Sequence, residues 1–543
     1  MRSLVDVARS LQTTLNYRCR PDTNARFEIG SIILLKNSYL LKFNQISIVN
    51  NAYFSIFEKI SIEMSKSYSI PAEYILDRIR FENPWWKTGQ PTADMDFLPK
   101  RLYFDLFFPF VTDRSVKRAL VLMGPRRVGK TVMMYQAIGK LMDKGVDARK
   151  LFFIGIDNPI YINLGLQELL QLGMEASGQD STDGLYVFFD EIQYLKDWER
   201  HLKVLVDSYP TIKFVVSGSA AAALRLKSTE SGAGRFTDFM LPPMTFQEYI
   251  HLTRQEHLLR PAKIRYNNQD IDFFESIDPK TLNAHFFSYI NYGGYPEMVF
   301  SDTVQRNMGR YIKNDIIDKV LLRDLPSLYG IRDVQELNRF FTYLAYNTGR
   351  EFSFEKMGRE SGVDKALLRR YMEYLEAAFL IKVVNKIDQN ARHFKRITAF
   401  KVYLTNTSLR SALFSSVEPI ADDAGNMVET AIFGQWMHRD HLDLKYAQWK
   451  SSGSEGEVDM VLLDGSKLKP AWAVEVKWSN RYADKPASLK SLLDFCRNNG
   501  LSSALVTTID RSETITHNGI ALTFVPASLY AYSIGVRTLQ MRQ

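Results

Sequence analysis

Four short apolar runs dominate the pattern of hydrophobic and polar positions between residues 119 and 219. They are ALVLM from Ala119, LFFIGI from Leu151, LYVFF from Leu185 and IKFVVSGS from Ile212. The runs alternate with segments of helical periodicity, and the first of these, TVMMYQAIGKLMDKG, ends at Gly145. Apolar runs of this length between helices predict a parallel sheet that is covered on both faces. The predicted fold class is therefore α/β.

The pattern changes on either side of this region. Residues 245–330 predict helices rich in aromatic side chains, and the segment from Arg350 predicts two short helices and a strand, with Gly362 between the helices as in a helix-turn-helix. From about Asp422 the pattern becomes α/β again, with predicted strands EVDMVLL and WAVEVKW. The first hundred residues predict a mixed α/β region, whose tryptophan pair at 85–86 we expect to pack against the next domain.

Composition narrows the class of protein without naming it. The 543 residues suggest three or four domains, and the apolar share of 45% and charged share of 24% are ordinary for a globular chain. No run approaches the roughly 18 apolar residues of a membrane span, and the N-terminus lacks the apolar core of a signal peptide. Two distant cysteines, Cys19 and Cys496, favour a reducing compartment, so the predicted location is cytoplasmic. The net charge of +8 permits a polyanionic partner but does not demonstrate one.

The strongest chemical signal lies between the first predicted strand and the first helix. This segment fits GxxxxGK[ST] and consists of Gly124, Pro125, Arg126, Arg127, Val128, Gly129, Lys130 and Thr131. Glycines let backbone N–H groups close around phosphate oxygens, and the helix N-terminus adds positive potential. We expect Lys130 to reach the β- and γ-phosphates and the Thr131 hydroxyl to ligate Mg²⁺. The alternative is a chance match in a loop, which the flanking strand and helix disfavour.

Two acids follow the third predicted strand. Asp190 emerges at the carboxyl end of LYVFF, the edge at which ligands bind in open α/β sheets. We expect Asp190 to hold Mg²⁺ through water and Glu191 to polarise the attacking water. The alternative is that the pair only begins the next helix, since acids suit helix N-termini. Their position after a phosphate loop favours hydrolysis.

Three polar residues further along are weaker candidates. Ser217 and Ser219, at the end of the fourth strand, either hydrogen-bond the attacking water or γ-phosphate or are small turn residues, and the sequence does not separate the two interpretations. Arg235 follows a glycine-containing loop. It is either a solvated surface arginine or an arginine finger for the γ-phosphate of a neighbouring subunit.

The segments GPRRVGKT, FFDEIQ, VVSGSAAAAL and GRFTDFMLPPMTFQEYI, in this order, resemble the AAA-plus (STAND-like) P-loop ATPases of bacteria and archaea. In particular they resemble a group with a lid, a winged helix and a C-terminal restriction-endonuclease-like domain, and NYGGYPEMV and IIDKVLLRDLP resemble its lid. The resemblance covers roughly residues 80–540. It implies Lys130 and Thr131 for nucleotide and Mg²⁺, Asp190 and Glu191 for hydrolysis, and Arg235 as the arginine finger.

Five domains are predicted from these observations together. They are an N-terminal domain of unassigned role at 1–95, an AAA-plus core at 96–245, a helical lid at 246–335, a winged helix at 336–420 and a PD-(D/E)xK nuclease-like α/β domain at 421–543.

Basic residues in the predicted winged helix are candidates for DNA contact. Lys365, Arg369 and Arg370 lie off the apolar face of its second helix, and a basic wing follows with Lys386, Arg392, His393, Lys395 and Arg396. These groups either meet phosphates or are merely solvated, and both interpretations stay open. Base-specific readout is disfavoured because the helix shows no obvious Asn or Gln contact to adenine.

Carboxylates in the last α/β region suggest a second site. Glu475 and Lys477 lie two apart on WAVEVKW, so they project from the same face of a strand, and Asp459 on EVDMVLL can complete an acidic pocket. Burial of such groups is costly unless they pair with each other or with a metal. A salt-bridged structural cluster is the alternative.

This order of residues resembles the D…ExK arrangement of PD-(D/E)xK nucleases, in which Glu429 on a preceding helix corresponds to an acid that often joins the site. The resemblance implies one or two Mg²⁺ ions, or Mn²⁺, held by Asp459 and Glu475, with Lys477 either orienting the attacking water or stabilising the phosphorane-like charge.

The leading hypothesis is therefore an ATP-binding and ATP-hydrolysing AAA-plus protein coupled to a Mg²⁺-dependent nuclease-like domain. It would process or cleave DNA as a homo-oligomer, a ring or partial ring, without a membrane. The alternative is an ATP-driven switch or scaffold whose nuclease-like domain is catalytically silent and binds a partner.

Overall fold

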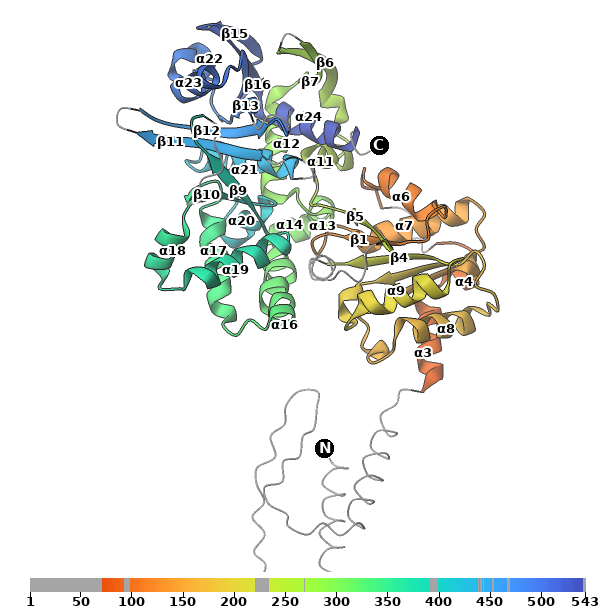
Figure 1. Ribbon diagram of the computed structural model, residues 1–543. Coiled ribbons are helices and arrows are strands. Elements are labelled where there is room, and N and C mark those ends of the chain that lie inside the picture. Colours follow the sequence, from red (N-terminus) through yellow and green to blue (C-terminus); the bar gives the residue numbers. More distant parts are fainter. Residues whose placement is uncertain are drawn as a thin grey trace, which may run out of the picture. The chain divides into compact units, whose positions relative to one another are not determined.

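The computed structural model describes residues 71–540, apart from gaps at 92–97, 220–233, 268, 391–398, 438, 440–441, 443, 452–453 and 466–468. The described residues belong to one unit that begins at Pro71 (Figure 1). The strands and helices predicted before this residue lie outside the described part of the chain. No helix in the described part combines the length and apolar composition needed to cross a membrane.

Five parallel strands form the sheet that carries the phosphate loop (Figure 1). Their order is β2 (Leu151–Gly155), β3 (Tyr186–Asp190), β4 (Lys213–Gly218), β1 (Ala119–Met123) and β5 (Phe236–Met240). The first four coincide with the predicted apolar runs, so the predicted parallel α/β sheet is confirmed. The edge strand β5 is missing from the prediction because Thr237 and Asp238 interrupt its apolar pattern and leave it only partly buried.

Helices cover both faces of this sheet, as the pattern predicts. On one face α6 (Phe104–Thr112) and α7 (Lys130–Asp143) pack with Leu120 and Leu122. On the other, α3 (Ala72–Glu82), α8 (Leu166–Ser177) and α9 (Trp198–Ser208) pack with Val121 and Val187. Short 3-10 turns η1 (Ala148–Lys150), η2 (Pro159–Tyr161) and η3 (Ile192–Tyr194) join these elements.

The tryptophan pair packs against the sheet, as expected. Trp85 and Trp86 belong to α4 (Trp85–Thr88), and both indole N–H groups donate to the carbonyl of Leu151 at 2.9 Å. Asn83 also donates to Phe153 O at 2.7 Å. The helices α3 and α4 therefore pack with β2, although the predicted boundary at residue 95 places them in the N-terminal domain.

The segment after the sheet is only partly helical. It contains α11 (Phe246–Leu252), η5 (Glu256–Leu258), the hairpin β6 (Leu259–Tyr266) and β7 (Gln269–Ser276), α12 (Pro279–Tyr292), α13 (Pro296–Phe300), α14 (Asp302–Arg306), α15 (Met308–Ile312), the π-helical segments η6 (Lys313–Asp318) and η7 (Val320–Asp324), and α16 (Leu325–Tyr329). The prediction of helices throughout 245–330 is wrong at the hairpin. LRPAKIRY and QDIDFFES alternate exposed and less exposed side chains with the period of two that is typical of strands.

The predicted helix-turn-helix forms two helices that meet at Gly362, whose φ of +73° ends the first of them. Its elements are α17 (Val334–Tyr346), β8 (Glu351–Phe352), α18 (Phe354–Ser361), α19 (Lys365–Ala377), β9 (Ile381–Ile387), β10 (Phe400–Leu404) and α20 (Ser408–Leu413).

A second sheet of nine strands spans the last two predicted domains, in the order β15-β16-β14-β13-β12-β11-β9-β10-β8. Its further members are β11 (Leu444–Ser451), β12 (Ser454–Leu463), β13 (Pro470–Glu475), β14 (Ser503–Thr508), β15 (Glu513–His517) and β16 (Ile520–Pro526), with α21 (Ala424–Trp436), α22 (Arg481–Asp484), η8 (Pro486–Ser488), α23 (Lys490–Asn499) and α24 (Ala527–Gln540) around them. Because β9 pairs with β11, one sheet continues across the predicted boundary at residue 420. Within this sheet β9 and β11 lie between β10 and β12.

Candidate nucleotide and carboxylate sites

The predicted phosphate loop connects β1 to α7. A Cβ atom on Gly124 would lie 2.1 Å from the carbonyl oxygen of Leu241, so only glycine fits where the loop passes the end of β5. Gly129 precedes α7 with a φ of +95°, a backbone conformation that also favours glycine. The two glycines of the motif thus fix the shape of the loop.

Backbone groups of the loop are available for a phosphate. The described residues supply no hydrogen-bond partner for the amides of Gly129, Lys130 and Thr131, which form the N-terminus of α7. The Lys130 ammonium donates to the carbonyls of Gly124 at 3.1 Å and Pro125 at 2.9 Å. Burial lowers the pKa of Lys130, whose side chain is held by neutral carbonyls. These residues fit a bound triphosphate.

Three predicted residues meet beneath the loop. The hydroxyl of Thr131 donates to Asp190 Oδ2 at 2.7 Å, and the hydroxyl of Ser217, on the neighbouring strand β4, donates to Asp190 Oδ1. Burial and the nearby Glu191 raise the pKa of Asp190 to about 6. A buried carboxylate held only by hydroxyls is stabilised by a cation, so the donor set fits Mg²⁺.

Glu191 and Ser219 are joined by a residue that the sequence analysis did not identify. Gln193, on η3, donates to Glu191 Oε2 and accepts from the amide of Ser219 at 3.0 Å. The backbone of Glu191 is left-handed, with a φ of +54°, and its amide donates to Ser217 Oγ at 3.0 Å. The buried hydroxyl of Ser219 has no partner among the described residues, so it can meet a water or a phosphate oxygen. The only signal for Gln193 is its position two residues after Glu191.

The side chains of the two arginines in the loop form ion pairs with acids of the predicted lid. Arg126 forms a bidentate pair with Asp324, with both N–O distances at 2.9 Å. Arg127 pairs with Glu297 at 2.9 Å and Asp315 at 2.8 Å. Asp315 and Asp324 lie on the π-helical segments η6 and η7, a geometry frequent at functional sites. The sequence analysis predicts both arginines as nucleotide-binding residues, and the structure joins their side chains to the predicted lid.

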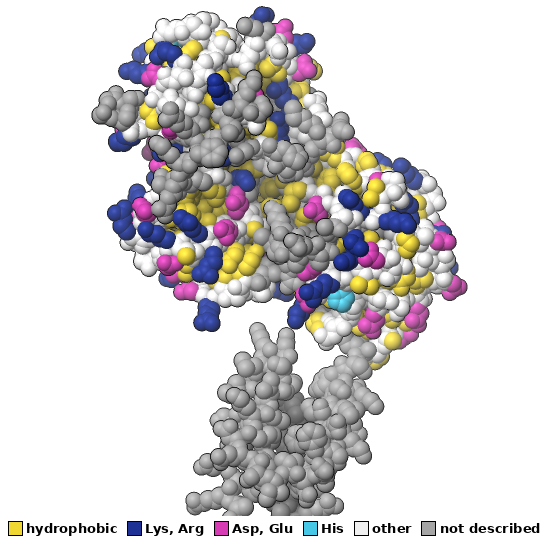
Figure 2. Space-filling view, viewed as in Figure 1, with side chains coloured by type: hydrophobic (Ala, Val, Ile, Leu, Met, Phe, Trp, Pro, Cys, Tyr) yellow, Lys and Arg dark blue, Asp and Glu magenta, His cyan; other side chains and the backbone are white. Residues whose placement is uncertain are grey.

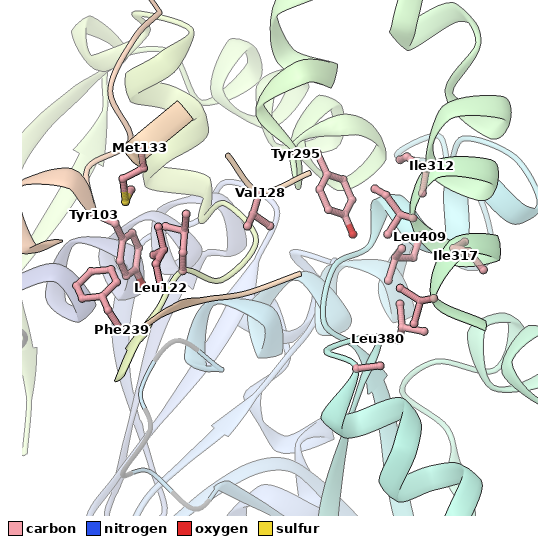
Figure 3. Packing of buried hydrophobic residues seen from close by; sticks show 14 of the residues in the cluster. Tyr103, Leu122, Val128, Met133, Phe239, Tyr295, Ile312, Ile317, Leu380 and Leu409 are labelled. Atoms are coloured by element: carbon pink, nitrogen blue, oxygen red, sulfur yellow. The ribbon is translucent and has the colours of Figure 1, made fainter. Parts of the chain in front are cut away.

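An apolar contact reinforces this connection. Figure 3 shows Val128 and Tyr295 between the residues around Leu122 and those around Ile312 and Leu409, all within one buried cluster. The predicted lid and the sheet therefore share a hydrophobic core at the loop.

Arg235 lies at the other end of the sheet. It directly precedes β5, and its carbonyl accepts from the amide of Ala119 at the start of β1. The loop begins at the opposite end of β1, so about 15 Å of strand separates the two. The guanidinium pairs with Asp207 at 2.8 Å and is 38% exposed. Arg235 therefore lies too far from the loop to reach a nucleotide bound at it.

The predicted carboxylates come together from α21, β12 and β13. Asp459 on β12 and Glu475 on β13 lie one position beyond the paired residues Met460 and Val474, so their side chains are direct cross-strand neighbours. Lys477 follows β13, and its ammonium lies 2.7 Å from Glu475 Oε1 and 3.3 Å from Asp459 Oδ2. Burial and Asp459 raise the pKa of Glu475 to about 8, and its buried Oε2 has no partner among the described residues.

A lysine from outside the predicted nuclease-like domain completes this cluster. Lys401 on β10 lies 2.7 Å from Glu457, 3.0 Å from Glu429 and 3.8 Å from Asp459. The hydroxyl of Tyr403, on the same strand, donates to Glu429 at 2.5 Å. Sequence reasoning missed Lys401, although a charged residue in the apolar strand FKVYL is itself a signal, because lysine is almost never buried without a partner.

The carboxylate cluster holds excess negative charge. The cluster consists of the carboxylates of Glu429, Glu457, Asp459 and Glu475 and the ammonium groups of Lys401 and Lys477. When all six groups are ionised, their formal charge is −2. The oxygen donors, this charge and the unpartnered Oε2 of Glu475 fit one divalent cation. In the described part of the chain, however, no three acids, histidines or cysteines gather as a preformed metal site. Lys401 and Lys477 stand between the carboxylates instead.

Basic side chains of the predicted winged helix are surface groups among acids. Figure 2 shows dark blue Lys and Arg side chains together with magenta acidic ones over α18 and α19. Lys365 lies 3.8 Å from Glu355, and Arg369 stacks over Phe354. Lys386 bonds Gln448 at 2.7 Å. The remaining predicted wing residues, Arg392, His393, Lys395 and Arg396, lie outside the described residues.

The sheet and its loop define a P-loop nucleotide-binding domain of the α/β class. Residues 116–250 match the family profile described as an AAA domain, so the chain contains an AAA-type ATPase domain. Residues 283–419 and 424–530 match two profiles that are each described as a domain of unknown function, DUF8612 and DUF4143. The nuclease-like character of the C-terminal region therefore stays a prediction.

Two relatives and one solved structure are similar to parts of this chain. An uncharacterized protein of Methanocaldococcus jannaschii is 24% identical over 382 residues, which cover 69% of this chain and 78% of that protein. An uncharacterized protein of Haemophilus influenzae is 22% identical over 324 residues, covering 59% and 74%. The Aeropyrum pernix Orc1 protein in complex with DNA is 11% identical at a TM-score of 0.30, covering 61% of this chain and 95% of that one.

Proposed function

We propose that this protein is an ATP-hydrolysing AAA-plus enzyme whose nucleotide cycle controls a metal-dependent nuclease-like site acting on DNA. The observation that carries the ATPase part is the meeting of Thr131, Asp190 and Ser217 beneath a loop with free amides. Thr131 and Asp190 would hold Mg²⁺ there, and the cation would neutralise charge on the phosphates.

The residues of the loop and strand ends have separate roles in this proposal. The free amides and Lys130 bind the β- and γ-phosphates, and Thr131 and Asp190 hold the cation. Once Gln193 no longer donates its hydrogen bond to Glu191, Glu191 accepts a proton from the attacking water, and Ser219 orients that water. Arg235 serves the site of a neighbouring subunit, which would require a homo-oligomer, a ring or partial ring.

Contacts that run from the loop through the predicted lid to the end of β10 support coupling. Arg126 and Arg127 hold the π-helical segments, and a Cβ atom on Gly129 would lie 3.9 Å from Pro296. Two residues earlier, the amide of Gly294 donates to Ser408, just beyond β10. Movement of the lid on ATP binding can thus reach the strand that carries Lys401.

The carboxylate cluster supports phosphodiester hydrolysis. In this proposal Asp459 and Glu475 hold Mg²⁺ or Mn²⁺, Glu429 assists, and Lys477 orients the attacking water. The bound metal would lower the pKa of that water and stabilise charge on the scissile phosphate. The Lys and Arg side chains that lie among acids over α18 and α19 would contact the DNA backbone.

One observation favours a second candidate, an ATP-driven switch whose nuclease-like domain is catalytically silent. Each carboxylate of the cluster is already ion-paired by Lys401 or Lys477. A cluster closed in this way can serve as a structural joint between β10 and β12 and leave chemistry to the ATPase domain alone.

One variant tests the ATPase that both candidates share, and a second variant separates them. Glu191→Gln should abolish ATP turnover while ATP binding persists, which tests the ATPase in both. Glu475→Ala should abolish cleavage of linear, supercoiled and single-stranded DNA in Mg²⁺ or Mn²⁺ with ATP present. If the unmodified protein leaves all three DNA forms intact in both metals, the nuclease proposal is wrong and the switch remains.

A further inference from the structure

Lys401 is the cation of the carboxylate cluster that the proposed chemistry does not use. Its side chain is 4% exposed, and every group it pairs with there is a carboxylate, namely Glu457, Glu429 and Asp459. It comes from β10, within the segment 283–419 that matches one profile, whereas its partners lie in the segment 424–530 that matches another. The ammonium is thus delivered to the cluster from a separate part of the chain.

The two lysines lie on different sides of Asp459. Lys477 faces Oδ2 at 3.3 Å, and Lys401 faces Oδ1 at 3.8 Å. Lys477 also bonds Glu475, so it belongs to the pair of carboxylates that would hold the metal. Lys401 instead neutralises Glu429 and the oxygen of Asp459 that Lys477 leaves free.

A divalent cation bound by Asp459 would therefore approach a buried positive charge. Two like charges a few ångströms apart repel strongly where water is excluded, and the repulsion doubles for a divalent ion. Loss of the Lys401 charge would also change the formal charge of the ionised cluster from −2 to −3. Once the Lys401 charge is lost, the relief of this repulsion and the more negative charge of the cluster would both favour metal binding.

We propose that Lys401 is a tethered counter-cation that competes with a divalent metal for Asp459 and Glu429 and thereby sets the metal affinity of the carboxylate cluster. This inference rests on the proposed metal site. It makes Lys401 a regulatory group of the site: the metal is held tightly only when β10 withdraws the ammonium.

The test is a titration of the full-length protein with Mn²⁺ in the absence of nucleotide, with free Mn²⁺ followed by electron paramagnetic resonance. Binding that disappears in Asp459→Asn is assigned to the cluster. Lys401→Met, which keeps the length and loses the charge, should bind Mn²⁺ at this site at least about tenfold more tightly. Lys401→Arg keeps the charge and should stay within about twofold of the unmodified protein.

Lys386→Met is the matched control. Lys386 lies on the neighbouring strand β9 and pairs with Glu351 at 3.3 Å. The same substitution there should leave Mn²⁺ affinity unchanged. Lys401→Gln supplies a second neutral variant that still donates hydrogen bonds to the carboxylates. Should both neutral variants unfold without metal, Mn²⁺ must restore their folding, because the metal would replace the missing charge.

The outcomes are distinct. Tighter Mn²⁺ binding in Lys401→Met or Lys401→Gln, with no change in Lys401→Arg, supports the proposal. Unchanged or weaker binding in folded neutral variants, or unfolded variants that Mn²⁺ does not rescue, overturns it and leaves the nuclease proposal standing. If neither the unmodified protein nor the neutral variants show binding that depends on Asp459, the metal site itself is wrong and both proposals fall.

Discussion

The nucleotide loop and the carboxylate cluster both bury lysines and acids, but they hold those charges in opposite ways. At the loop, Lys130 is bound by backbone carbonyls and Asp190 by hydroxyl groups. At the cluster, Lys401 and Lys477 are ion-paired with carboxylates. A ligand that enters a site held by neutral dipoles displaces no charged group. A ligand that enters a site closed by ion pairs must displace or move a cation. The loop is ready for its ligand, and the cluster is held closed.

The largest expected effect comes from removing the charge that only the loop site should need. Lys130→Ala should reduce ATP turnover by about a hundredfold or more, because the ammonium would stabilise charge on the transferred phosphoryl group. Mn²⁺ binding at the carboxylate cluster should be unaffected. Lys140→Ala, on the same helix and 37% exposed, is the control. Unchanged turnover in Lys130→Ala would mean that the phosphate site lies elsewhere.

The next effect tests whether the loop is shaped by its backbone. Gly124→Ala would place a methyl group 2.1 Å from Leu241 O, so either the loop or β5 must shift. We expect a loss of about 3 kcal/mol in the free energy of unfolding, measured with urea. Gly425→Ala, in an exposed turn of α21 with open space around it, should be neutral or slightly stabilising. Equal effects of the two changes would contradict a loop fixed by glycine.

The same contrast explains what could be predicted from the sequence. The loop is contiguous, and its partner Asp190 follows a strand end, so local pattern and sheet topology suffice to place both. Residues that depend on contacts across the fold cannot be found from local pattern: Asp324 lies about two hundred positions from Arg126, and Lys401 comes to the cluster from a strand of the preceding predicted domain. No local period reports such pairings.

The carboxylate cluster should respond to pH over a wider range than the loop site, where the pKa of Asp190 is raised only to about 6. Burial and Asp459 raise the pKa of Glu475 to about 8, from about 4.5 in the unfolded chain. The folded protein therefore keeps a proton that the unfolded chain releases, so this contribution to stability is complete below about pH 4.5 and is lost as the pH rises towards 8.

Urea unfolding in EDTA from about pH 5 to about pH 8 measures that loss. The unmodified protein should lose on the order of a few kcal/mol relative to Glu475→Gln, which has no carboxylate to ionise. Parallel pH profiles for the two proteins would mean that the cluster is not strained by its own charge, and the contrast with the loop would weaken.

The smallest expected effects concern the arginines, which are the one place where the loop itself uses ion pairs. Arg126 and Asp324 are 12% and 11% exposed, and their bidentate contact should give a coupling free energy of about 1–3 kcal/mol in a double-mutant cycle with alanine. Arg127 and Glu297 are 42% and 45% exposed, so their coupling should stay below about 1 kcal/mol.

The cycles are measured by urea unfolding without nucleotide and repeated with a non-hydrolysable ATP analogue. If the lid moves when ATP binds, the Arg126–Asp324 coupling should shrink with the analogue. A coupling that is identical in both conditions would make this pair a fixed structural contact, and the loop would then pass its state to the lid by another route, for which the apolar core that contains both Val128 and Tyr295 is the next candidate.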